Sequence, residues 1–490
     1  MSLLDSLYCQ PADRVAVRIG ALDISYGRLL ADVAAASAIF ASQGVTPGSK
    51  LGLRAGTLRT GHSYANWVAH LAAIHLGAVH VSIMDQSSLA AANQAGMIDT
   101  IIGSDAALAY APAALKRIIF SCDPATPLTA ATAPPDSSAS AARLSMTSGT
   151  TGSPKFVRWD MPTIAARIGQ AADVLPICPE TIFYCLLHLS TAPGFRYPLA
   201  VWQAGGCMLL PDDPDVRVRD QALGQSTLIV TSPVQLAERV REFPDPWEDR
   251  DARTIVVLGG RLPSAVRDRA LANACTTLLV GYGSTETGSV ALGPAALIDR
   301  HGGATGFVRE DVTVEIVDAA RTPVPAGQPG VVRIKAKMMG SGYETPHGAQ
   351  ESSHFDGGYF YPGDIGRLYE DGLLAIEGRV SETLNIGGWK ISAPELESRL
   401  SFLPGVDDLA ACVMPLPEGD LLTIAVVTRD GIDLQPMAGL IRAQLPDGRA
   451  FHMIRLQSIP RNAMGKIPRA TIAGKLIEHY AANRSTVVNA

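Results

Sequence analysis

After Asp160 the chain alternates short apolar runs with helix-like segments, and this alternation limits the fold more than any other feature of the sequence. The runs are rich in Val, Ile and Leu, as expected of strands that are buried on both faces. Helical patterns such as Pro233–Val240 and Pro263–Asn273 lie among them. We therefore predict an α/β fold in which doubly wound parallel sheets are covered by helices. The predicted strands are Ile182–Leu187, Cys207–Leu210, Leu228–Thr231, Ile255–Leu258 and Leu278–Val280.

The flanking regions add further domains or subdomains. The apolar runs Leu51–Ala55 and Val79–Ile83 predict two more strands, with a helix between His62 and Leu76. After Gly306, short runs separated by Pro and Gly turns predict a mainly antiparallel β subdomain. The last ~110 residues combine two strands with two helices, which is enough chain for a small α+β domain. Because 490 residues are too many for one hydrophobic core, this division is expected.

Composition excludes several classes of protein. Hydrophobic residues make up 47% and charged residues 18%, as in a folded soluble protein. The formal charge of −6 gives no electrostatic reason to expect nucleic acid or an anionic membrane as a partner. The most apolar stretch, Trp67–Met84, contains three histidines, so we expect no membrane span. No signal peptide is visible and the seven cysteines are scattered without a CxxC pair, which favours a cytoplasmic protein without a disulfide framework.

The first motif with chemical content is Ser145–Lys155, which reads SMTSGTTGSPK. Its Gly, Ser and Thr residues allow backbone N–H groups and hydroxyls to converge on phosphate oxygens, and Lys155 adds a positive charge. The lysine follows a proline, so the segment is not a Walker A loop. On composition alone, a flexible Ser/Gly surface loop is an equal alternative.

The second motif, Val280–Gly288, reads VGYGSTETG and follows a predicted strand. Its glycine spacing fails the GxGxxG dinucleotide fingerprint, which disfavours an oxidoreductase. It does place the Thr285 hydroxyl beside the Glu286 carboxylate at the carboxyl end of a parallel strand, where ligands gather in open sheets. A carboxylate there could hold Mg²⁺ bound to a nucleotide. The ordinary alternative is a solvated loop glutamate.

Two further elements lie toward the C-terminus. Asp364, in the sequence YFYPGD, offers a carboxylate for ribose hydroxyls, and Arg379 offers a guanidinium for hydroxyl or phosphate oxygens. The local alternative is a Pro-Gly-Asp turn in a hairpin. The segments Asn385–Glu397 and Pro460–Arg469 each place a lysine close to glycine, although Lys466 taken alone would be a surface charge.

In this order and at these separations, the motifs resemble the adenylate-forming superfamily of acyl-CoA synthetases, luciferases and nonribosomal-peptide adenylation domains. The resemblance covers nearly the whole chain, from Ile24–Tyr26 to Lys466. It implies that ATP activates a carboxylic acid to an acyl-adenylate with release of pyrophosphate. The acyl group would then pass to a pantetheine thiol, either of CoA or of phosphopantetheine.

The resemblance implies roles for individual residues. Lys466 would bridge the reacting carboxylate and the α-phosphate, Thr285 would contact the α-phosphate, and Glu286 would ligate Mg²⁺. A carboxylate that attacks a phosphate brings two anions together, so such cations are needed. His188 would line the acyl site, and its alternative is a satisfied core histidine. The residues implied in ATP binding are Thr147, Ser148, Gly149, Thr150, Thr151, Gly152, Lys155, Gly260, Arg261, Tyr282, Asp364 and Arg379; those of the acyl pocket are His188, Gly259 and Gly283; and those of the thiol tunnel are Gly387, Gly388 and Trp389.

The resemblance also implies two domains. Residues 1–380 would form the AMP-binding domain, and residues 381–490 a mobile C-terminal domain that carries Lys466. Rotation of this domain would remove the lysine after adenylation and bring Gly387 and Gly388 beside the thiol, where a side chain would obstruct the pantetheine arm. The hinge falls at Ser381, a departure from the Asp or Lys that is common in the family.

The substrate is less constrained. No acidic residue occurs between Cys185 and Phe195, where amino-acid-activating relatives place an aspartate, and Gly283 stands where acetate-specific relatives carry tryptophan. We therefore predict an apolar acyl or aryl acid. Arg196 is an alternative partner for a second carboxylate, although a surface arginine is the more common interpretation. Two alternative functions are a stand-alone enzyme that loads an acyl carrier protein and a non-catalytic nucleotide-binding protein, and the presence of both Glu286 and Lys466 argues against the second.

Overall fold

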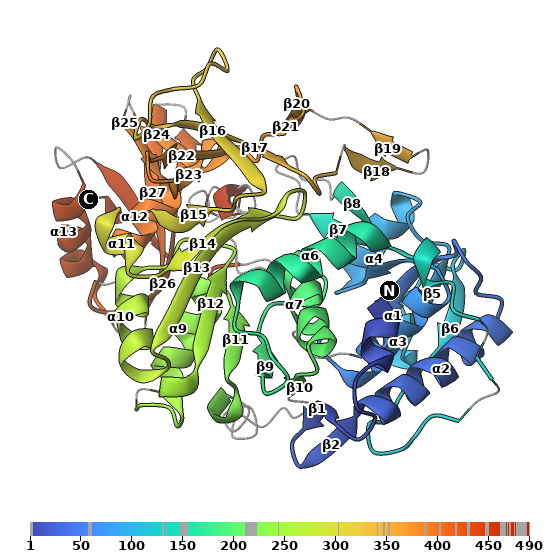
Figure 1. Ribbon diagram of the computed structural model, residues 1–490. Coiled ribbons are helices and arrows are strands. Elements are labelled where there is room, and N and C mark those ends of the chain that lie inside the picture. Colours follow the sequence, from blue (N-terminus) through green and yellow to red (C-terminus); the bar gives the residue numbers. More distant parts are fainter. Residues whose placement is uncertain are drawn as a thin grey trace. The chain divides into compact units, whose positions relative to one another are not determined.

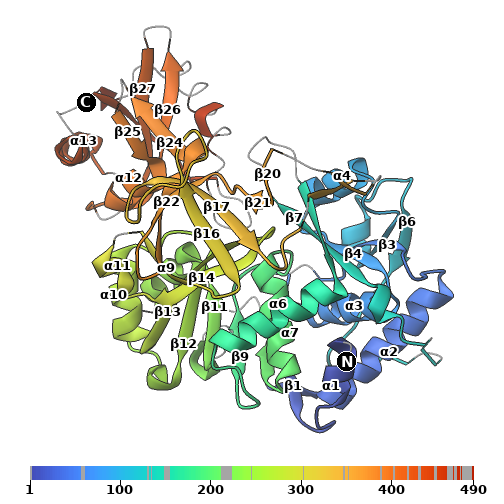
Figure 2. The ribbon, with the colours of Figure 1, turned by 45° about the horizontal axis from the view of Figure 1, so that its top comes forward.

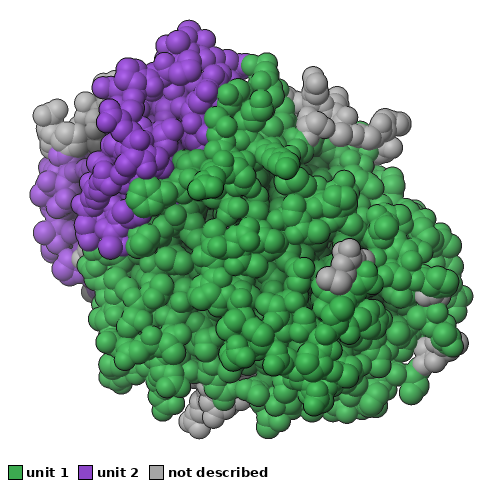
Figure 3. All heavy atoms as spheres, viewed as in Figure 1, with its two compact units in different colours: residues 1–295, 306–313, 334–360 green, residues 296–305, 314–333, 361–490 purple. Residues whose placement is uncertain are grey.

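The chain forms two compact units, which Figure 3 distinguishes by colour. Unit 1 comprises residues 1–295, 306–313 and 334–360, and unit 2 comprises residues 296–305, 314–333 and 361–490. No helix in the described ranges is long and apolar enough to cross a membrane. The computed structural model describes residues 3–489 except 57–60, 130–131, 134, 148–154, 211–222, 244, 302, 341, 346–347, 351–352, 387–388, 401–402, 417–418, 429–431, 446–449, 461–466, 468, 470–471, 475 and 477–487.

Unit 1 contains a six-stranded sheet in the order β6-β5-β3-β4-β7-β8. Neighbouring strands are parallel except for the hairpin of β7 and β8. Parallel neighbours need crossover connections, and short helices supply most of them here. The strands are β3 (Lys50–Arg54), β4 (Val79–Ser82), β5 (Thr100–Gly103), β6 (Lys116–Ile119), β7 (Ala142–Thr147) and β8 (Lys155–Asp160), and the helices among them are α3 (Tyr64–His75), α4 (Gln86–Gln94) and α5 (Asp105–Leu108).

A second sheet of unit 1 follows the order β2-β1-β10-β9-β11-β12-β13-β14. The strands from β1 to β13 along this order are parallel, whereas β14 returns antiparallel to β13. The strands are β1 (Val15–Ile19), β2 (Leu22–Ser25), β9 (Ile182–Cys185), β10 (Cys207–Leu209), β11 (Leu228–Thr231), β12 (Thr254–Leu258), β13 (Thr277–Ser284) and β14 (Gly288–Pro294), and the helices are α1 (Leu3–Tyr8), α2 (Tyr26–Ser42), α6 (Met161–Val174), α7 (Ala192–Gln203), α9 (Pro233–Glu242) and α10 (Ser264–Asn273).

Helices between the two sheets hold the core of unit 1. In Figures 1 and 2, α6 and α7 run side by side, and α6 packs against β8 while α7 packs against β9 and β10. Trp67 of α3 stacks on Phe195 of α7 with ring centroids 5.8 Å apart and meets Trp202 edge-on at 4.9 Å. All three rings are fully buried, and aromatic pairs of this geometry stabilise a core beyond the area that they bury. Thr191 caps α7, because its hydroxyl accepts from the Gly194 N–H.

Shorter strands complete unit 1. Phe307 and Val308 of β15 (Ala304–Val308) pair with β14, and β20 pairs with β21. A separate two-stranded ribbon, β18 with β19, begins at Tyr343. The strands are β18 (Tyr343–Thr345), β19 (Gly348–Gln350), β20 (Phe355–Asp356) and β21 (Tyr359–Phe360).

Unit 2 consists of antiparallel strands followed by an α+β region. β22 pairs antiparallel with both β17 and β23, and β16 pairs with β17. Farther along the chain, β26 and β27 form a long hairpin that β28 joins in parallel. The apolar core of this α+β region includes Leu396, Ile424 and Met453, which are all fully buried. The elements are α11 (Leu297–Arg300), β16 (Val312–Val317), β17 (Gly330–Ala336), β22 (Asp364–Leu368), β23 (Leu373–Arg379), β24 (Thr383–Ile386), β25 (Trp389–Ser392), α12 (Ala393–Leu400), β26 (Val406–Leu416), β27 (Gly419–Thr428), α13 (Leu434–Gln444), β28 (Phe451–Arg455) and β29 (Val488–Asn489).

The predicted fold class is confirmed. The parallel sheets, the antiparallel strands after Gly306 and the α+β region at the end of the chain are all present. The compact units group the antiparallel strands with the C-terminal region. The functional division into residues 1–380 and 381–490 therefore stays a prediction about motion.

Candidate functional site

Predicted site residues follow the carboxyl ends of parallel strands in unit 1. β9 ends at Cys185, β12 at Leu258 and β13 at Ser284, so His188, the 259–261 segment and the 282–286 segment lie along the same edge of the sheet. Leu258 is in register with Gly281, which places the 259–261 and 282–286 segments beside each other. The structure thus brings together Gly259, Gly260, Arg261, Tyr282, Gly283, Thr285 and Glu286.

Gly283 has a structural reason to be glycine. A Cβ at this position would collide with the Gly288 carbonyl oxygen across the β13–β14 hairpin. The close approach of the two strands therefore requires glycine whatever the size of the acyl group. Its role in the acyl pocket stays a prediction.

Glu286 lies in the tight turn between β13 and β14. The Thr287 N–H donates to the Ser284 hydroxyl at 3.1 Å, which closes the turn. The Glu286 side chain is 7% exposed, and its Oε1 accepts a hydrogen bond from the Tyr343 hydroxyl at 3.0 Å. Burial and the neighbouring carboxylate raise the pKa of Tyr343, so the phenol stays a donor. The alternative of a solvated loop glutamate is wrong, because this carboxylate is held inside the protein.

Arg167 of α6 fixes the backbone of the same turn. Its guanidinium donates to the carbonyl oxygens of Thr285 and Glu286 at 2.9 and 3.0 Å, and to that of Met338 at 3.2 Å. The guanidinium also stacks over Trp159 at 4.2 Å. Burial lowers the pKa of Arg167 to about 9, which leaves it protonated at neutral pH. Arg167 therefore holds the turn through its carbonyl groups and does not form an ion pair with the Glu286 carboxylate.

Tyr343 connects Glu286 to the hairpin of the first motif. In the β7–β8 hairpin, Thr147 lies opposite Lys155, and the Lys155 ammonium lies 4.7 Å from the centre of the Tyr343 ring. One tyrosine thus binds the cation through its ring and the carboxylate through its hydroxyl. The remaining residues of the first motif, Ser148, Gly149, Thr150, Thr151 and Gly152, lie outside the described residues.

Asp364 and Arg379 form a pair in unit 2. They are directly opposite each other in the β22–β23 hairpin, and the Arg379 Nε donates to the Asp364 carboxylate at 2.8 Å. Asp364 is 4% exposed. The structure shows this ion pair, which the sequence analysis did not predict, while the contact of both residues with ribose stays a prediction.

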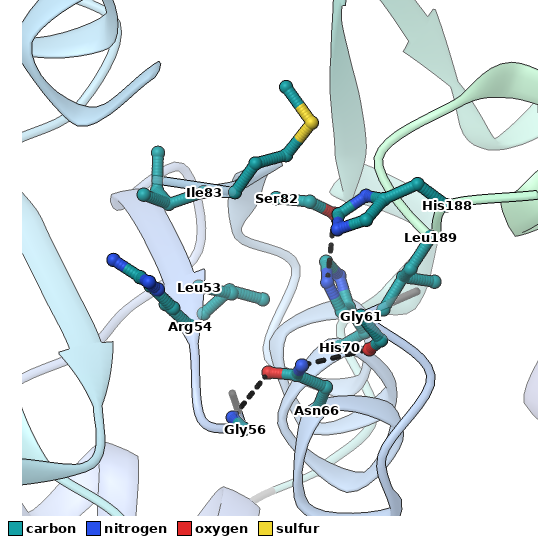
Figure 4. A pocket seen from close by; sticks show the side chains of 11 residues that line it. Leu53, Arg54, Gly56, Gly61, Asn66, His70, Ser82, Ile83, His188 and Leu189 are labelled. Atoms are coloured by element: carbon teal, nitrogen blue, oxygen red, sulfur yellow. Dashed lines mark hydrogen bonds between the residues drawn. The ribbon is translucent and has the colours of Figure 1, made fainter. Parts of the chain in front are cut away.

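His188 lines a small pocket together with residues from the six-stranded sheet and α3, shown in Figure 4. Its Nδ1 accepts the Ser190 N–H at 3.0 Å, so the neutral ring carries its proton on Nε2. Burial and the nearby Arg143 lower the pKa of His188 to about 4, so the ring is neutral at pH 7. Gly61 lies directly against the ring, since a Cβ there would be 2.9 Å from Nε2. Figure 4 shows Leu53, Arg54 and Ile83 across the pocket from His188 and Leu189.

The structure corrects the interpretation of Arg196 as a surface arginine. Its side chain is 7% exposed, donates to the Tyr197 hydroxyl at 3.1 Å and lies over the same ring at 4.6 Å.

The predicted C-terminal residues are only partly described. Lys466, Gly387 and Gly388 lie outside the described residues; for Trp389 only the backbone, in β25, is described. Ser381 is exposed in the short 3₁₀ turn Val380–Glu382. Arg469, three residues after Lys466, forms a bidentate ion pair with Glu397 of α12 at 2.6 and 2.9 Å. The hinge and the thiol tunnel stay predictions.

Sequence reasoning missed Tyr343 and Arg167. Their partners are 57 and 118 residues away in the chain. Tyr343 follows a Gly-rich stretch at the start of a short strand, and Arg167 lies in an amphipathic helix, so neither position carries a local motif.

Comparison with solved structures identifies the fold. ATP-bound MatB from Rhodopseudomonas palustris superposes with a TM-score of 0.81 and 20% identity, over 98% of this chain and 100% of MatB. The family model described as AMP-binding enzyme matches residues 5–344. The chain belongs to the AMP-binding enzyme family.

Two curated relatives indicate the range of the family. The 2-hydroxy-7-methoxy-5-methyl-1-naphthoate–CoA ligase of Streptomyces carzinostaticus is 26% identical over 69% of this chain, and the match spans 63% of that enzyme. The salicyl-AMP ligase / salicyl-S-ArCP synthetase of Mycobacterium tuberculosis is 24% identical over 95% of this chain and 88% of its own length. The first relative is thus matched over less than two thirds of its length and the second over most of it.

Proposed function

We propose that this protein is an acid–thiol ligase that converts a carboxylic acid and ATP to an acyl-adenylate and pyrophosphate. It then transfers the acyl group to a pantetheine thiol, that of CoA. The observation that carries the proposal is Glu286, a buried carboxylate that is held by a neutral hydroxyl at the carboxyl edge of the sheet. No ion pair joins this carboxylate to a described residue, so it is available to a cation that arrives with the nucleotide.

The residues present fit Mg²⁺ bound to ATP. No group of three or more His, Cys, Asp or Glu that could hold a metal ion occurs in the described part of the chain. Mg²⁺ needs only one or two carboxylates when phosphate oxygens and water complete its coordination shell. Glu286 would supply that carboxylate, and the bound ion would screen the phosphate charge. Tyr343 would orient the carboxylate in the way that outer-shell partners orient metal ligands.

The remaining site residues would place the nucleotide for attack. Thr147, Lys155 and the loop between them would contact the β- and γ-phosphates, and Thr285 would contact the α-phosphate. Lys466 would then hold the acid against the α-phosphate, so that the carboxylate oxygen forms a bond to the α-phosphorus while the bond to pyrophosphate breaks. In the second half-reaction the thiolate sulfur attacks the acyl carbon, AMP leaves and the thiol proton goes to solvent.

The thiol that accepts the acyl group has a specific alternative to CoA, namely the phosphopantetheine of a carrier protein. The salicyl relative, which matches 95% of this chain, is named for transfer to an aryl carrier protein. A carrier-loading enzyme is therefore the second candidate. An aryl or other acyl acid and a cytoplasmic location complete the proposal, and both rest on the sequence.

A pyrophosphate-release assay with a panel of carboxylic acids tests the first half of the proposal. We expect release that depends on acid, ATP and Mg²⁺. Repeating the reaction with CoA and with phosphopantetheinylated carrier proteins separates the two acceptors, because the thioester is detected on one or the other. No release with any acid, combined with intact ATP binding, would favour a non-catalytic nucleotide-binding protein.

A further inference from the structure

Arg143 of β7 is a fully buried cation without an acidic partner. Its side chain is 0% exposed, and no ion pair joins it to a carboxylate in the part of the chain that the structure describes. It donates to the Ser82 hydroxyl at 3.3 Å and to the Leu189 carbonyl at 2.7 Å, and it lies 3.9 Å from the centre of the Phe195 ring. Its Nε has no hydrogen-bond partner among these residues. Burial of a charge with so few partners is unfavourable unless another group compensates it.

Arg253 shows what a purely structural buried arginine looks like in the same unit. It donates to four backbone carbonyl oxygens, those of Gly224, Ser226, Glu248 and Ala274, at 2.8–2.9 Å. It also lies over the Trp247 ring at 5.5 Å. Carbonyl groups thus satisfy Arg253 throughout, whereas Arg143 has one carbonyl, one hydroxyl and an unbonded Nε. Fold stability alone explains Arg253 better than it explains Arg143.

Arg143 lies directly behind the pocket beside His188. Ser82, which accepts from Arg143, lines this pocket, and so does His70, whose Nε2 is 3.1 Å from the same hydroxyl. Burial and Arg143 lower the pKa of His70 well below its usual value, so the ring does not add or remove charge at pH 7. The wall that these residues form is therefore polar and carries a net positive charge.

Asp85, an acidic residue whose charge acts on His188 and on Arg54, is already engaged. Asp85 caps α4, and its carboxylate accepts from the Ser88 N–H at 2.8 Å and from the Ser87 hydroxyl at 3.1 Å. Burial and Arg143 lower the pKa of His188 to about 4 although the charge of Asp85 acts in the opposite direction. Arg54, on the opposite wall, adds a second guanidinium to the lining. An anion from outside the chain would complete the charge balance of this pocket.

We propose that the pocket beside His188 selects carboxylic acids whose acyl group carries a second carboxylate at its far end. The His188 Nε2–H and the Ser82 hydroxyl would donate to that carboxylate, and Arg143 would stabilise it from behind. This inference rests on the proposed function and names its substrate class. It replaces the expectation of a wholly apolar acyl group, and it assigns the second carboxylate to Arg143 instead of Arg196.

Matched pairs of acids test the proposal on the wild-type protein. Each set contains three compounds built on the same straight-chain or aryl group. The first is a monocarboxylic acid, the second carries another carboxylate at the far end, and the third has that far carboxylate converted to its methyl ester. We expect kcat/KM for pyrophosphate release to be highest for one of the diacids and to fall when its far carboxylate is esterified. Preference for the monocarboxylic member of every pair would overturn the inference and leave the proposed ligase function intact. No release with any acid would contradict the proposed function itself.

Arg143→Met tests the residue. We expect the diacid-to-monoacid ratio of kcat/KM to fall by roughly 10- to 100-fold, the usual worth of a charge–charge interaction across one hydroxyl inside a protein. Arg253→Met is the matched control, since it removes a buried arginine that should lower the melting temperature and leave the ratio unchanged. Ser82→Ala is a milder second variant for the case in which Arg143→Met does not fold, and we expect a smaller fall in the same ratio. An equal loss of kcat/KM for both members of a pair in the Arg143 and Ser82 variants would show a structural role and overturn the proposal.

Discussion

Two polar regions of unit 1 have opposite electrostatic designs. At the β13–β14 turn, a buried carboxylate is held by a hydroxyl, while the neighbouring guanidinium of Arg167 donates to carbonyl oxygens. Beside His188, a buried guanidinium is held by a hydroxyl and a carbonyl, and the surrounding histidines are neutral. The first region thus contains a buried carboxylate without an ion pair and the second a buried guanidinium without one, among the described residues. We call them the negative region and the positive region after these two groups.

The difference indicates what each region is built to receive. Buried charges are usually neutralised by a partner within the protein, because desolvation outweighs most other contributions. The Asp364–Arg379 pair in unit 2 follows that rule. Glu286 is held by one hydroxyl, and Arg143 by one hydroxyl and one carbonyl group, fewer partners than the four carbonyl groups that bind Arg253. We therefore infer that each binds a ligand, a metal cation for the carboxylate and an anion for the guanidinium. A ligase that takes Mg·ATP and an acid needs both kinds of region.

The largest expected effect comes from a cation that neither region supplies. Lys466→Ala should lower the rate of acyl-adenylate formation by roughly 1000-fold, because the two reacting anions would lose their shared positive charge. Transfer from synthetic acyl-adenylate to the thiol should stay within about 3-fold of wild type, well short of the effect of one lost charged contact. The two half-reactions are measured separately by pyrophosphate release and by thioester formation. Adenylation at near wild-type rate would mean that one of the two regions of unit 1 already provides the cation.

Glu286→Gln tests the negative region directly. We expect the Mg²⁺ concentration for half-maximal activity to rise by about 100-fold, since an amide oxygen is a weaker ligand for a hard cation than a carboxylate. A titration of pyrophosphate release with Mg²⁺ at saturating ATP measures the shift. The acid selectivity of the His188 pocket should not change. An unaltered Mg²⁺ requirement would place the metal site elsewhere and remove the contrast between the two regions.

Tyr343→Phe separates the two contacts of that tyrosine. The variant keeps the ring under Lys155 and removes the hydroxyl that orients Glu286. We expect a rise of about 10-fold in the Mg²⁺ requirement, as for other partners of metal ligands. Tyr26→Phe is the matched control, because the Tyr26 hydroxyl is also buried but donates only to the carbonyl oxygens of Trp202 and Gly206. If both variants lower stability and neither changes the Mg²⁺ requirement, the Tyr343 hydroxyl serves the fold alone.

The sequence predicted the negative region far better than the positive one. Glu286 could be placed at the carboxyl end of a strand because the strand, the turn and the acidic residue are contiguous in the chain. Arg143 has no such local signal, since it lies within an apolar strand and its partner Ser82 is 61 residues away. Burial depends on the packing of distant elements, which short motifs do not encode. For the same reason, the sequence analysis assigned neither Tyr343 to Glu286 nor Arg379 to Asp364 as a hydrogen-bond partner.

The smallest expected effect is on stability and concerns the positive region under acid conditions. His80 is fully buried, and its ring lies against His70 and Phe195 with centroids 5.1 and 6.0 Å away. Burial and Arg143 lower its pKa to about 3, far below the value near 6.5 of an unfolded chain. Between these values the unfolded chain binds a proton that the folded chain does not. The stability that the protein gains from a neutral His80 is therefore fully present above about pH 6.5 and is lost as the pH falls toward 3.

Acidification from about pH 7 to about pH 5 should thus lower the unfolding free energy of the protein by about 2 kcal/mol through His80 alone. His80→Gln removes the titrating ring, so its melting temperature should fall less over this interval than that of the wild type. The charged and titratable groups around it, Arg143, His62, His70, His188 and Asp85, are unchanged in the variant. His301→Gln in unit 2 is the control, since that ring is partly exposed and stacks on Tyr369 at 3.8 Å. Acid sensitivity that is equal in the wild type and both variants would mean that His80 accepts a proton in the folded state, and that Arg143 does not set the charge of this region.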